Sequence, residues 1–175
     1  MTDDITLRLW TAADLPVLER SNTEEMMAFL GGPETPQQLE ERHARYLRLD
    51  ESGEARMFTI SIPGDPESVG SVGYWSALWH GEPVYESGWS IATPFQGRGI
   101  ATRALVACLR DAAARNEFER VLAFPRVDNR GSNSLCRSTG FQFRGEEDFE
   151  YPKGRPIRVN AWSLELAELR RPAPD

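Results

Sequence analysis

Cysteine and histidine are scarce in this sequence. Its 175 residues include two cysteines, Cys108 and Cys136, and two histidines, His43 and His80. Two cysteines provide no disulfide framework, and the four side chains lack the spacing of a zinc site. We therefore expect no metal site, two small buried thiols in the core, and no Ser-His-Asp arrangement.

Long hydrophobic runs and a surplus of positive charge are also missing. No stretch approaches the roughly 18 apolar residues of a membrane span, and the N-terminus, from Met1 to Asp4, lacks the features of a signal peptide. We expect no membrane association and a cytoplasmic location. Lys and Arg number 20 against 27 Asp and Glu, a net charge of −7. This balance argues against nucleic acid as the main ligand, because phosphate neutralisation needs surplus Lys and Arg.

The length predicts one domain, residues 1–175, with a core over about 5–166. A capping box, Thr35-Pro36-Gln37-Gln38, predicts a helix that ends near Gly53, and Thr11 is the expected N-cap of an earlier helix. The tail from Arg170 to Asp175 is expected to fray. Strands are expected at 5–10, 57–63, 69–76, 84–92, 120–127, 141–151 and 157–166, with further helices at 99–115 and 132–139. This order indicates an α/β or α+β fold with a mixed, mostly antiparallel sheet of about six or seven strands.

The most informative segment runs from Trp89 to Ala101, where a strand enters a glycine turn that opens a helix. Unpaired N–H groups at a helix start suit an anion such as a pyrophosphate. Gly97 and Gly99 allow close approach of the backbone, and Arg98 can add a charged contact. A dinucleotide fingerprint is disfavoured because Thr102 replaces its third glycine, and no Walker sequence is present. An ordinary strand–turn–helix junction remains the alternative.

Two motifs resemble those of the GNAT family of N-acetyltransferases. Gln96-x-x-Gly99-x-Ala101 is similar to its pyrophosphate motif, and Asn129-x-x-Ser132 followed by Gly140-Phe141 is similar to its second signature. The resemblance covers residues 5–166. The segments Leu30–Pro33 and Trp162–Leu166 resemble the branch that includes the RimJ and RimL ribosomal-protein N-terminal acetyltransferases.

The resemblance implies helices on both faces of the sheet and acetyl-CoA as co-substrate. Its pantetheine arm is expected between two parallel strands, 84–92 and 120–127, that splay apart. Pro125, which lacks an N–H, suits a strand that leaves its ladder. The expected acceptor is a small-molecule or peptide amine, and a homodimer is possible. The expected cofactor-binding residues are Ile91, Ala92, Thr93, Gln96, Gly97, Arg98, Gly99, Ile100, Ala101, Thr102, Asn129 and Asn133. Asn129 can instead be a turn or cap residue.

Glu86 is the candidate catalytic base. Alternation along the strand places it on one face with Val84, Gly88 and Ser90, small neighbours that leave room for a substrate. A carboxylate in a cleft can take the amine proton directly or through one water, and many relatives place a catalytic Glu on this strand. The alternative is a solvated strand residue. Asp148 and Glu150, on a later strand, are the reserve bases.

Ser132 is the candidate donor to the leaving thiolate. Many relatives use a tyrosine near this position, but here the stretch is Ser134-Leu135-Cys136-Arg137. The alternative role for Ser132 is the N-cap of the 132–139 helix. Trp75, Trp79 and Trp89 are expected in the core or the cleft wall. Two other functions remain open, namely an acyl-CoA-binding module without turnover and an enzyme that uses a longer donor such as succinyl-CoA.

Overall fold

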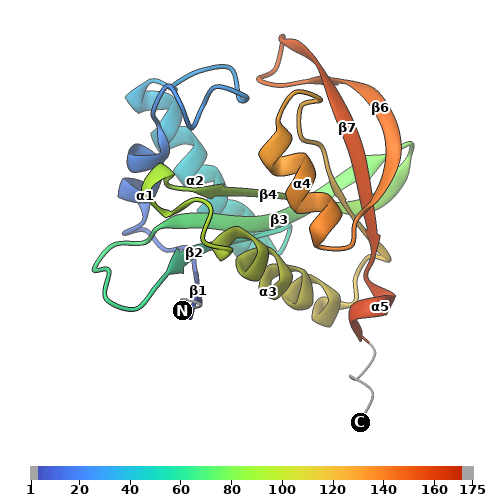
Figure 1. Ribbon diagram of the computed structural model, residues 1–175, viewed down its shortest axis with the longest axis horizontal. Helices are drawn as coiled ribbons and strands as arrows, with labels where there is room; N and C mark the ends of the chain where they lie inside the picture. Colours follow the sequence, from blue (N-terminus) through green and yellow to red (C-terminus); the bar gives the residue numbers. More distant parts are fainter. Residues whose placement is uncertain (1–3, 171–175) are drawn as a thin grey trace.

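A computed structural model describes residues 4–170. Its centre is a mixed sheet of seven strands in the order β1-β2-β3-β4-β5-β7-β6 (Figure 1). Neighbouring strands are antiparallel except for the parallel pair β4 and β5, which confirms the expected sheet. The strands are β1 (Thr6–Leu9), β2 (Ala55–Ser61), β3 (Gly70–Trp79), β4 (Glu82–Ile91), β5 (Arg120–Ala123), β6 (Gln142–Glu150) and β7 (Pro156–Glu165).

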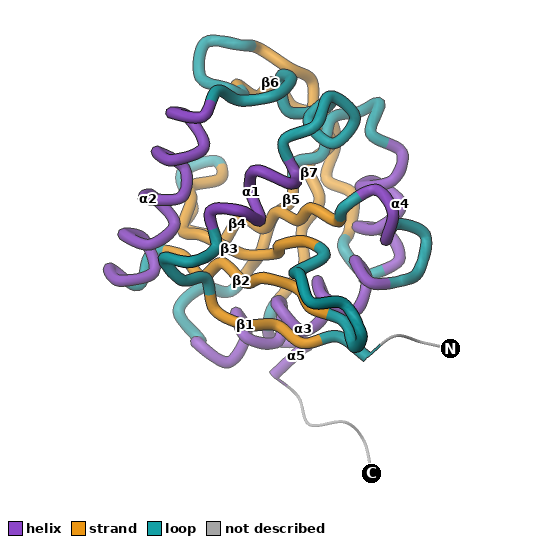
Figure 2. Tube along the Cα trace, turned by 90° about the vertical axis from the view of Figure 1, so that its left-hand side faces the viewer, coloured by secondary structure: helices purple, strands orange, loops and turns teal. Residues whose placement is uncertain are grey.

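Helices cover both faces of this sheet. They are α1 (Leu15–Ser21), α2 (Pro36–Ser52), α3 (Ile100–Arg115), α4 (Arg130–Ser138) and α5 (Ala167–Arg170), with a 3₁₀ turn, η1, at Thr93–Phe95. Tyr74 of β3 packs in the cluster that contains Leu105 of α3, whereas the next residue, Trp75, packs with Leu39 of α2. Successive strand residues point to opposite faces, so α3 and α2 lie on opposite faces. Figure 2 shows α2 and α4 on opposite sides of the strands.

The parallel pair β4–β5 is very short. Its register contains only Tyr85 with Val121 and Glu86 with Leu122, although β4 continues to Ile91. The strand expected over 120–127 ends at Ala123, and the chain beyond it stays beside β7, with a bridge between Arg126 and Val159. There the backbone N–H of Asn160 donates to Pro125 O. The two parallel strands therefore part after Glu86, as the resemblance implied.

The start of α1 and the end of α5 differ from the sequence predictions. Thr11 does not cap α1, which begins at Leu15 with Asp14 at the cap position. The backbone N–H and the hydroxyl of Thr11 instead donate to Asp14 Oδ2, at 2.7 and 2.9 Å. Arg170 does not fray, because it ends α5 and its guanidinium donates to Ala113 O and Phe118 O. Residues 171–175, the rest of the expected frayed tail, lie outside the described residues.

The capping box at the start of α2 is present as predicted. The Gln38 backbone N–H donates to Thr35 Oγ1 at 3.2 Å, and the Thr35 N–H donates to Gln38 Oε1 at 2.8 Å. The helix ends at Ser52, and its C-cap, Gly53, has a φ of 79°, in the left-handed region that glycine adopts without strain. Local sequence therefore sets both ends of α2.

We expect Thr35→Ala to lower the free energy of unfolding by about 1 kcal/mol, because the Gln38 N–H loses its acceptor. Thr35→Ser keeps the hydroxyl and should stay within about 0.5 kcal/mol of the wild type. Urea unfolding of the three proteins measures both values. Equal losses in the two variants would contradict the assignment of the effect to the hydroxyl.

Candidate active site

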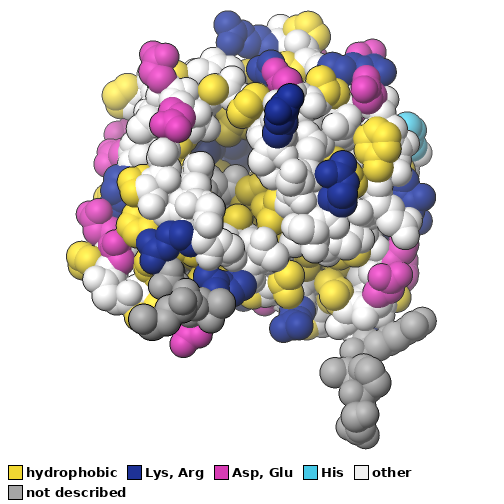
Figure 3. All heavy atoms as spheres, viewed as in Figure 1, with side chains coloured by type: hydrophobic (Ala, Val, Ile, Leu, Met, Phe, Trp, Pro, Cys, Tyr) yellow, Lys and Arg dark blue, Asp and Glu magenta, His cyan; other side chains and the backbone are white. Residues whose placement is uncertain are grey.

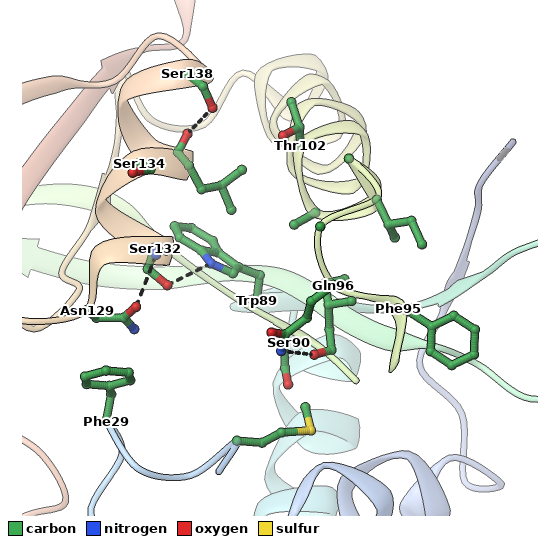
Figure 4. Close-up of a pocket in the computed structure, with 18 of the residues that line it drawn as sticks. Phe29, Trp89, Ser90, Phe95, Gln96, Thr102, Asn129, Ser132, Ser134 and Ser138 are labelled. Carbon is green, nitrogen blue, oxygen red and sulfur yellow. Dashed lines mark hydrogen bonds between the residues drawn. The ribbon is translucent and has the colours of Figure 1, made fainter. Parts of the chain in front are cut away.

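A cavity of about 540 Å³ lies beside the end of β4. Its walls come from β4, from the turn and first residues of α3, from α4, and from the segment between α1 and α2 (Figure 4). Figure 3 shows the molecular surface hollowed between α4 and the α1–α2 side, with hydrophobic side chains on the floor. The cavity thus lies on the side where β4 and β5 have parted.

The start of α3 supplies groups that can bind an anion. Gly99 is the N-cap with a φ of 73°, and Gly97 has a φ of 74°, so both positions favour glycine. A Cβ at either position would meet no atom within 4 Å. The first N–H groups of a helix have no partner within it. Both glycines line the cavity, so these amides can approach a bound phosphate closely.

The start of α4 forms the opposite wall. Asn129 is its N-cap, and Asn129 Oδ1 accepts from the Ser132 backbone N–H at 3.1 Å. Ser132 is therefore the third residue of the helix and not its cap, which removes that alternative role. The Ser132 hydroxyl faces the cavity and accepts a hydrogen bond from Trp89 Nε1 at 3.3 Å (Figure 4).

Glu86 lies where β4 and β5 last pair. Its register neighbours are Trp75 on β3 and Leu122 on β5. Burial raises the pKa of Glu86 to about 7, and a smaller opposing effect comes from the Trp75 indole. A carboxyl group with such a pKa exchanges its proton near neutral pH, as a general base requires.

The family assignment follows from a comparison of the sequence with protein-family models. Residues 4–142 match the model described as an acetyltransferase (GNAT) domain. The chain belongs to the GNAT acetyltransferase family. As a member of this family it is an acetyl-CoA-dependent N-acetyltransferase.

The fold of this chain is similar to those of three solved acetyltransferase structures. The acetyltransferase from Salmonella typhimurium that modifies the N-terminal serine of ribosomal protein L7/L12 has a TM-score of 0.76 at 22% identity, over 94% of this chain and 96% of that one. The spermidine N-acetyltransferase from Vibrio cholerae, in complex with CoA and spermine, has a TM-score of 0.77 at 19% identity, over 95% and 98%. An aminoglycoside acetyltransferase in complex with coenzyme A has a TM-score of 0.76 at 19% identity, over 97% and 100%.

The residues present fit the co-substrate of a GNAT enzyme. The open cradle at Gly97 and Gly99 suits the pyrophosphate, and the parted edge of β4 suits the pantetheine arm. Of the predicted cofactor-binding residues, the cavity is lined by Ile91, Gln96, Gly97, Gly99, Ile100, Ala101, Thr102 and Asn129. Gln96 also donates from Nε2 to Ile91 O at 2.9 Å, which holds the turn against β4.

Four predicted cofactor residues are not among those that line the cavity. Ala92 donates its N–H to Val69 O, Thr93 begins η1, and Arg98 stacks over the Phe95 ring at 5.6 Å. Asn133 is buried, and both ends of its amide are bonded within the protein. Its Nδ2 donates to the backbone oxygens of Arg126 and Asn129, and its Oδ1 accepts from Asn160 and Trp162. Asn133 thus fixes α4 against β7.

The surroundings of Glu86 differ from the prediction in one respect. Gly88 was expected to leave room for a substrate, but a Cβ there would lie 2.9 Å from the Trp75 ring. The Trp75 indole therefore covers Gly88, and the part of β4 that lines the cavity runs from Trp89 to Ile91. Glu86 itself is partly buried and is not among the cavity-lining residues.

The two reserve bases have other partners. Asp148 Oδ1 pairs with Arg158 Nη1 at 2.9 Å, and its side chain is 91% exposed. Glu150 accepts from the Gly154 backbone N–H. Both carboxylates are thus exposed and already have partners within the protein, whereas Glu86 is partly buried, and this contrast favours Glu86.

One wall of the site, formed by the segment between α1 and α2, was not predicted from the sequence. Glu25, Met26 and Phe29, from the segment between α1 and α2, line the cavity, and Figure 4 shows Phe29 below the start of α4. The only signal was a few apolar residues between two expected helices, with no periodic pattern. That signal does not show which surface they cover.

The composition predicts no metal site and no membrane-spanning segment. Within residues 4–170, no group of three His, Cys, Asp or Glu side chains is placed to hold a metal ion. In the same part of the chain, no helix has the length and apolarity to cross a membrane. Cys108 and Cys136 are buried free thiols, as expected for core residues.

Gly99→Val should weaken coenzyme A binding by at least about 10-fold, because the new side chain projects into the cradle. Gly64→Val is a matched control, since Gly64 also has a positive φ, of 83°, with no atom within 4 Å of a Cβ, and lies outside the cavity. Both variants should lose similar stability from backbone strain. Calorimetric titration with coenzyme A measures the affinities, and an equal loss in both variants would contradict the placement of the pyrophosphate.

Proposed function

We propose that this enzyme transfers acetyl from acetyl-CoA directly to a primary amine within a ternary complex, with Glu86 as base and Ser132 as donor to the leaving sulfur. The acceptor is a protein N-terminus or a small-molecule amine. The observation that carries the proposal is the position of Glu86, a partly buried carboxyl group at the last pair of two parting parallel strands.

The base is needed because amines are mostly protonated at neutral pH. Only roughly 0.04% of a lysine amine is neutral at pH 7, against roughly 10–15% of an α-amine. With a pKa of about 7, Glu86 is ionised in part of the population and can take a proton directly or through one water. Its pKa is thus better matched to an α-amine or to an amine of lowered pKa.

The start of α4 supports the role of Ser132. As the acetyl group leaves, negative charge develops on sulfur, and a hydroxyl hydrogen bond and the positive end of a helix both favour that charge. Ser132 combines both, as the third residue of a nine-residue helix. The carbonyl oxygen of the donor can be polarised by a backbone N–H near Ile91, where β4 is paired with β3 but no longer with β5.

The comparisons give three acceptor classes to test. The similar structures are named for a ribosomal-protein N-terminus, for spermidine and for aminoglycosides. We propose to offer the enzyme acetyl-CoA with a short peptide bearing a free α-amine, with spermidine and with kanamycin, and to follow thiol release. A homodimer stays a prediction, which light scattering of the same sample can test.

Glu86→Gln should lower kcat/KM by about 100-fold or more, because the amide cannot accept the amine proton. For the wild type, kcat/KM should rise with pH through about 7 as Glu86 ionises, and this rise should be absent in the variant. Asp148→Asn is the matched control, a carboxylate on β6 that is 91% exposed, and it should keep wild-type activity. Full turnover by Glu86→Gln across the pH range would refute Glu86 as the base.

The same pKa predicts a cost in stability. The unfolded chain releases the Glu86 proton above about pH 4.3, whereas the folded protein holds it up to about 7, so stability falls as pH rises between these values. Glu86→Gln should therefore be more stable than the wild type by about 1–2 kcal/mol near pH 8, discounted for partial solvent access, and should lose this advantage below about pH 4. Urea unfolding at the two pH values tests it, and a pH-independent difference would contradict the raised pKa.

A further inference from the structure

We propose that Trp89 is a positioning residue for thiolate departure, and that its indole N–H holds Ser132 Oγ so that the hydroxyl hydrogen points toward the sulfur of coenzyme A. This inference rests on the proposed role of Ser132. It goes further because it assigns a function to a tryptophan that the sequence placed only in the core or the cleft wall.

The bond between these residues joins the two walls of the cavity. Trp89 lies near the end of β4, beyond the last pair with β5, and Ser132 lies in the first turn of α4. Trp89 Nε1 donates to Ser132 Oγ at 3.3 Å, and both residues line the cavity (Figure 4). The separation is at the long end for an N–H to oxygen bond, and catalytic hydrogen bonds often tighten when the substrate complex forms.

The direction of this bond is fixed by chemistry. An indole nitrogen can only donate, whereas a hydroxyl group has one hydrogen and two acceptor positions. Ser132 Oγ is therefore the acceptor, and its own hydrogen remains for another partner. Within residues 4–170, Ser132 Oγ donates to no other protein group, and the Ser132 backbone N–H is already bonded to Asn129 Oδ1.

The hydroxyl hydrogen is then available at the moment of reaction. As the C–N bond of the amide forms, the C–S bond breaks and its electron pair goes to sulfur. The amine proton goes to Glu86 and from there to water, and water protonates the released thiolate. Ser132 keeps its proton and donates a hydrogen bond to sulfur, which the Trp89 N–H strengthens by polarising the hydroxyl.

The indole is itself held in place. Trp89 is partly buried and packs against the main hydrophobic cluster, so its N–H is aimed before the substrate arrives. A serine side chain has three staggered rotamers, and a fixed donor favours the one that brings Oγ toward β4. Such preorganisation avoids reorienting the hydroxyl during the reaction.

The test compares Trp89→Phe, Ser132→Ala and the double variant. Phenylalanine keeps an aromatic wall and removes the N–H. Single-turnover rates with the best acceptor of the panel above should fall about 2- to 5-fold in Trp89→Phe, while the KM for acetyl-CoA stays unchanged. In the Ser132→Ala background, the same change should have no further effect, since Trp89 acts through the hydroxyl.

A second readout needs no acceptor. The thiol pKa of bound coenzyme A can be followed by the ultraviolet absorbance of the thiolate during a pH titration. It should rise by a few tenths of a unit in Trp89→Phe and by more in Ser132→Ala. Trp79→Phe is the matched control, because the Trp79 indole donates to Glu147 outside the cavity, and it should leave the thiol pKa unchanged.

The outcomes separate this inference from the proposed function. An unchanged rate and thiol pKa in Trp89→Phe, or an equal loss with and without Ser132, would overturn the role of Trp89 and leave that of Ser132 intact. Wild-type values in Ser132→Ala would overturn both. If Trp89→Phe does not fold, benzothienylalanine at position 89, which has the shape of tryptophan without the N–H, gives the same comparison.

Discussion

The short parallel contact between β4 and β5 is the constraint on which the rest of the structure depends. Only two residue pairs join these strands, and beyond them the edge of β4 that faces away from β3 has no strand beside it. Unbonded backbone groups in a sheet are costly unless another partner takes their hydrogen bonds. The chain beyond β5 instead stays hydrogen-bonded to β7, which leaves this edge of β4 available for the amides of the acetyl-CoA arm.

Two different electrostatic environments meet where β4 and β5 separate. On one side of the sheet, Glu86 is buried enough to hold its pKa near 7. On the other, the helix starts of α3 and α4 present N–H groups that favour negative charge. A base that accepts a proton and a wall that stabilises a thiolate are therefore separated by the strand between them. Burial of Glu86 lowers the free energy of unfolding at neutral and higher pH, so its position serves the site and does not stabilise the fold.

Much of this arrangement could be predicted from the sequence, because its signals are local. The capping box at Thr35 and the glycine turn before α3 each specify a backbone conformation within a few residues. The positions that could not be predicted depend on distant partners. Asn133 is bonded to Trp162 on β7, and Gly88 is covered by Trp75 on β3, so neither role is visible in its own segment. Phe29 reaches the cavity from an irregular segment with no periodic pattern.

The most direct test of the central claim is a crystal structure of the protein with coenzyme A. The account predicts the pantetheine arm along the free edge of β4 near Ile91, the pyrophosphate at Gly97 and Gly99, and the sulfur within hydrogen-bond distance of Ser132 Oγ. An arm that lies outside the space between β4 and β5, or a sulfur remote from Ser132, would contradict it.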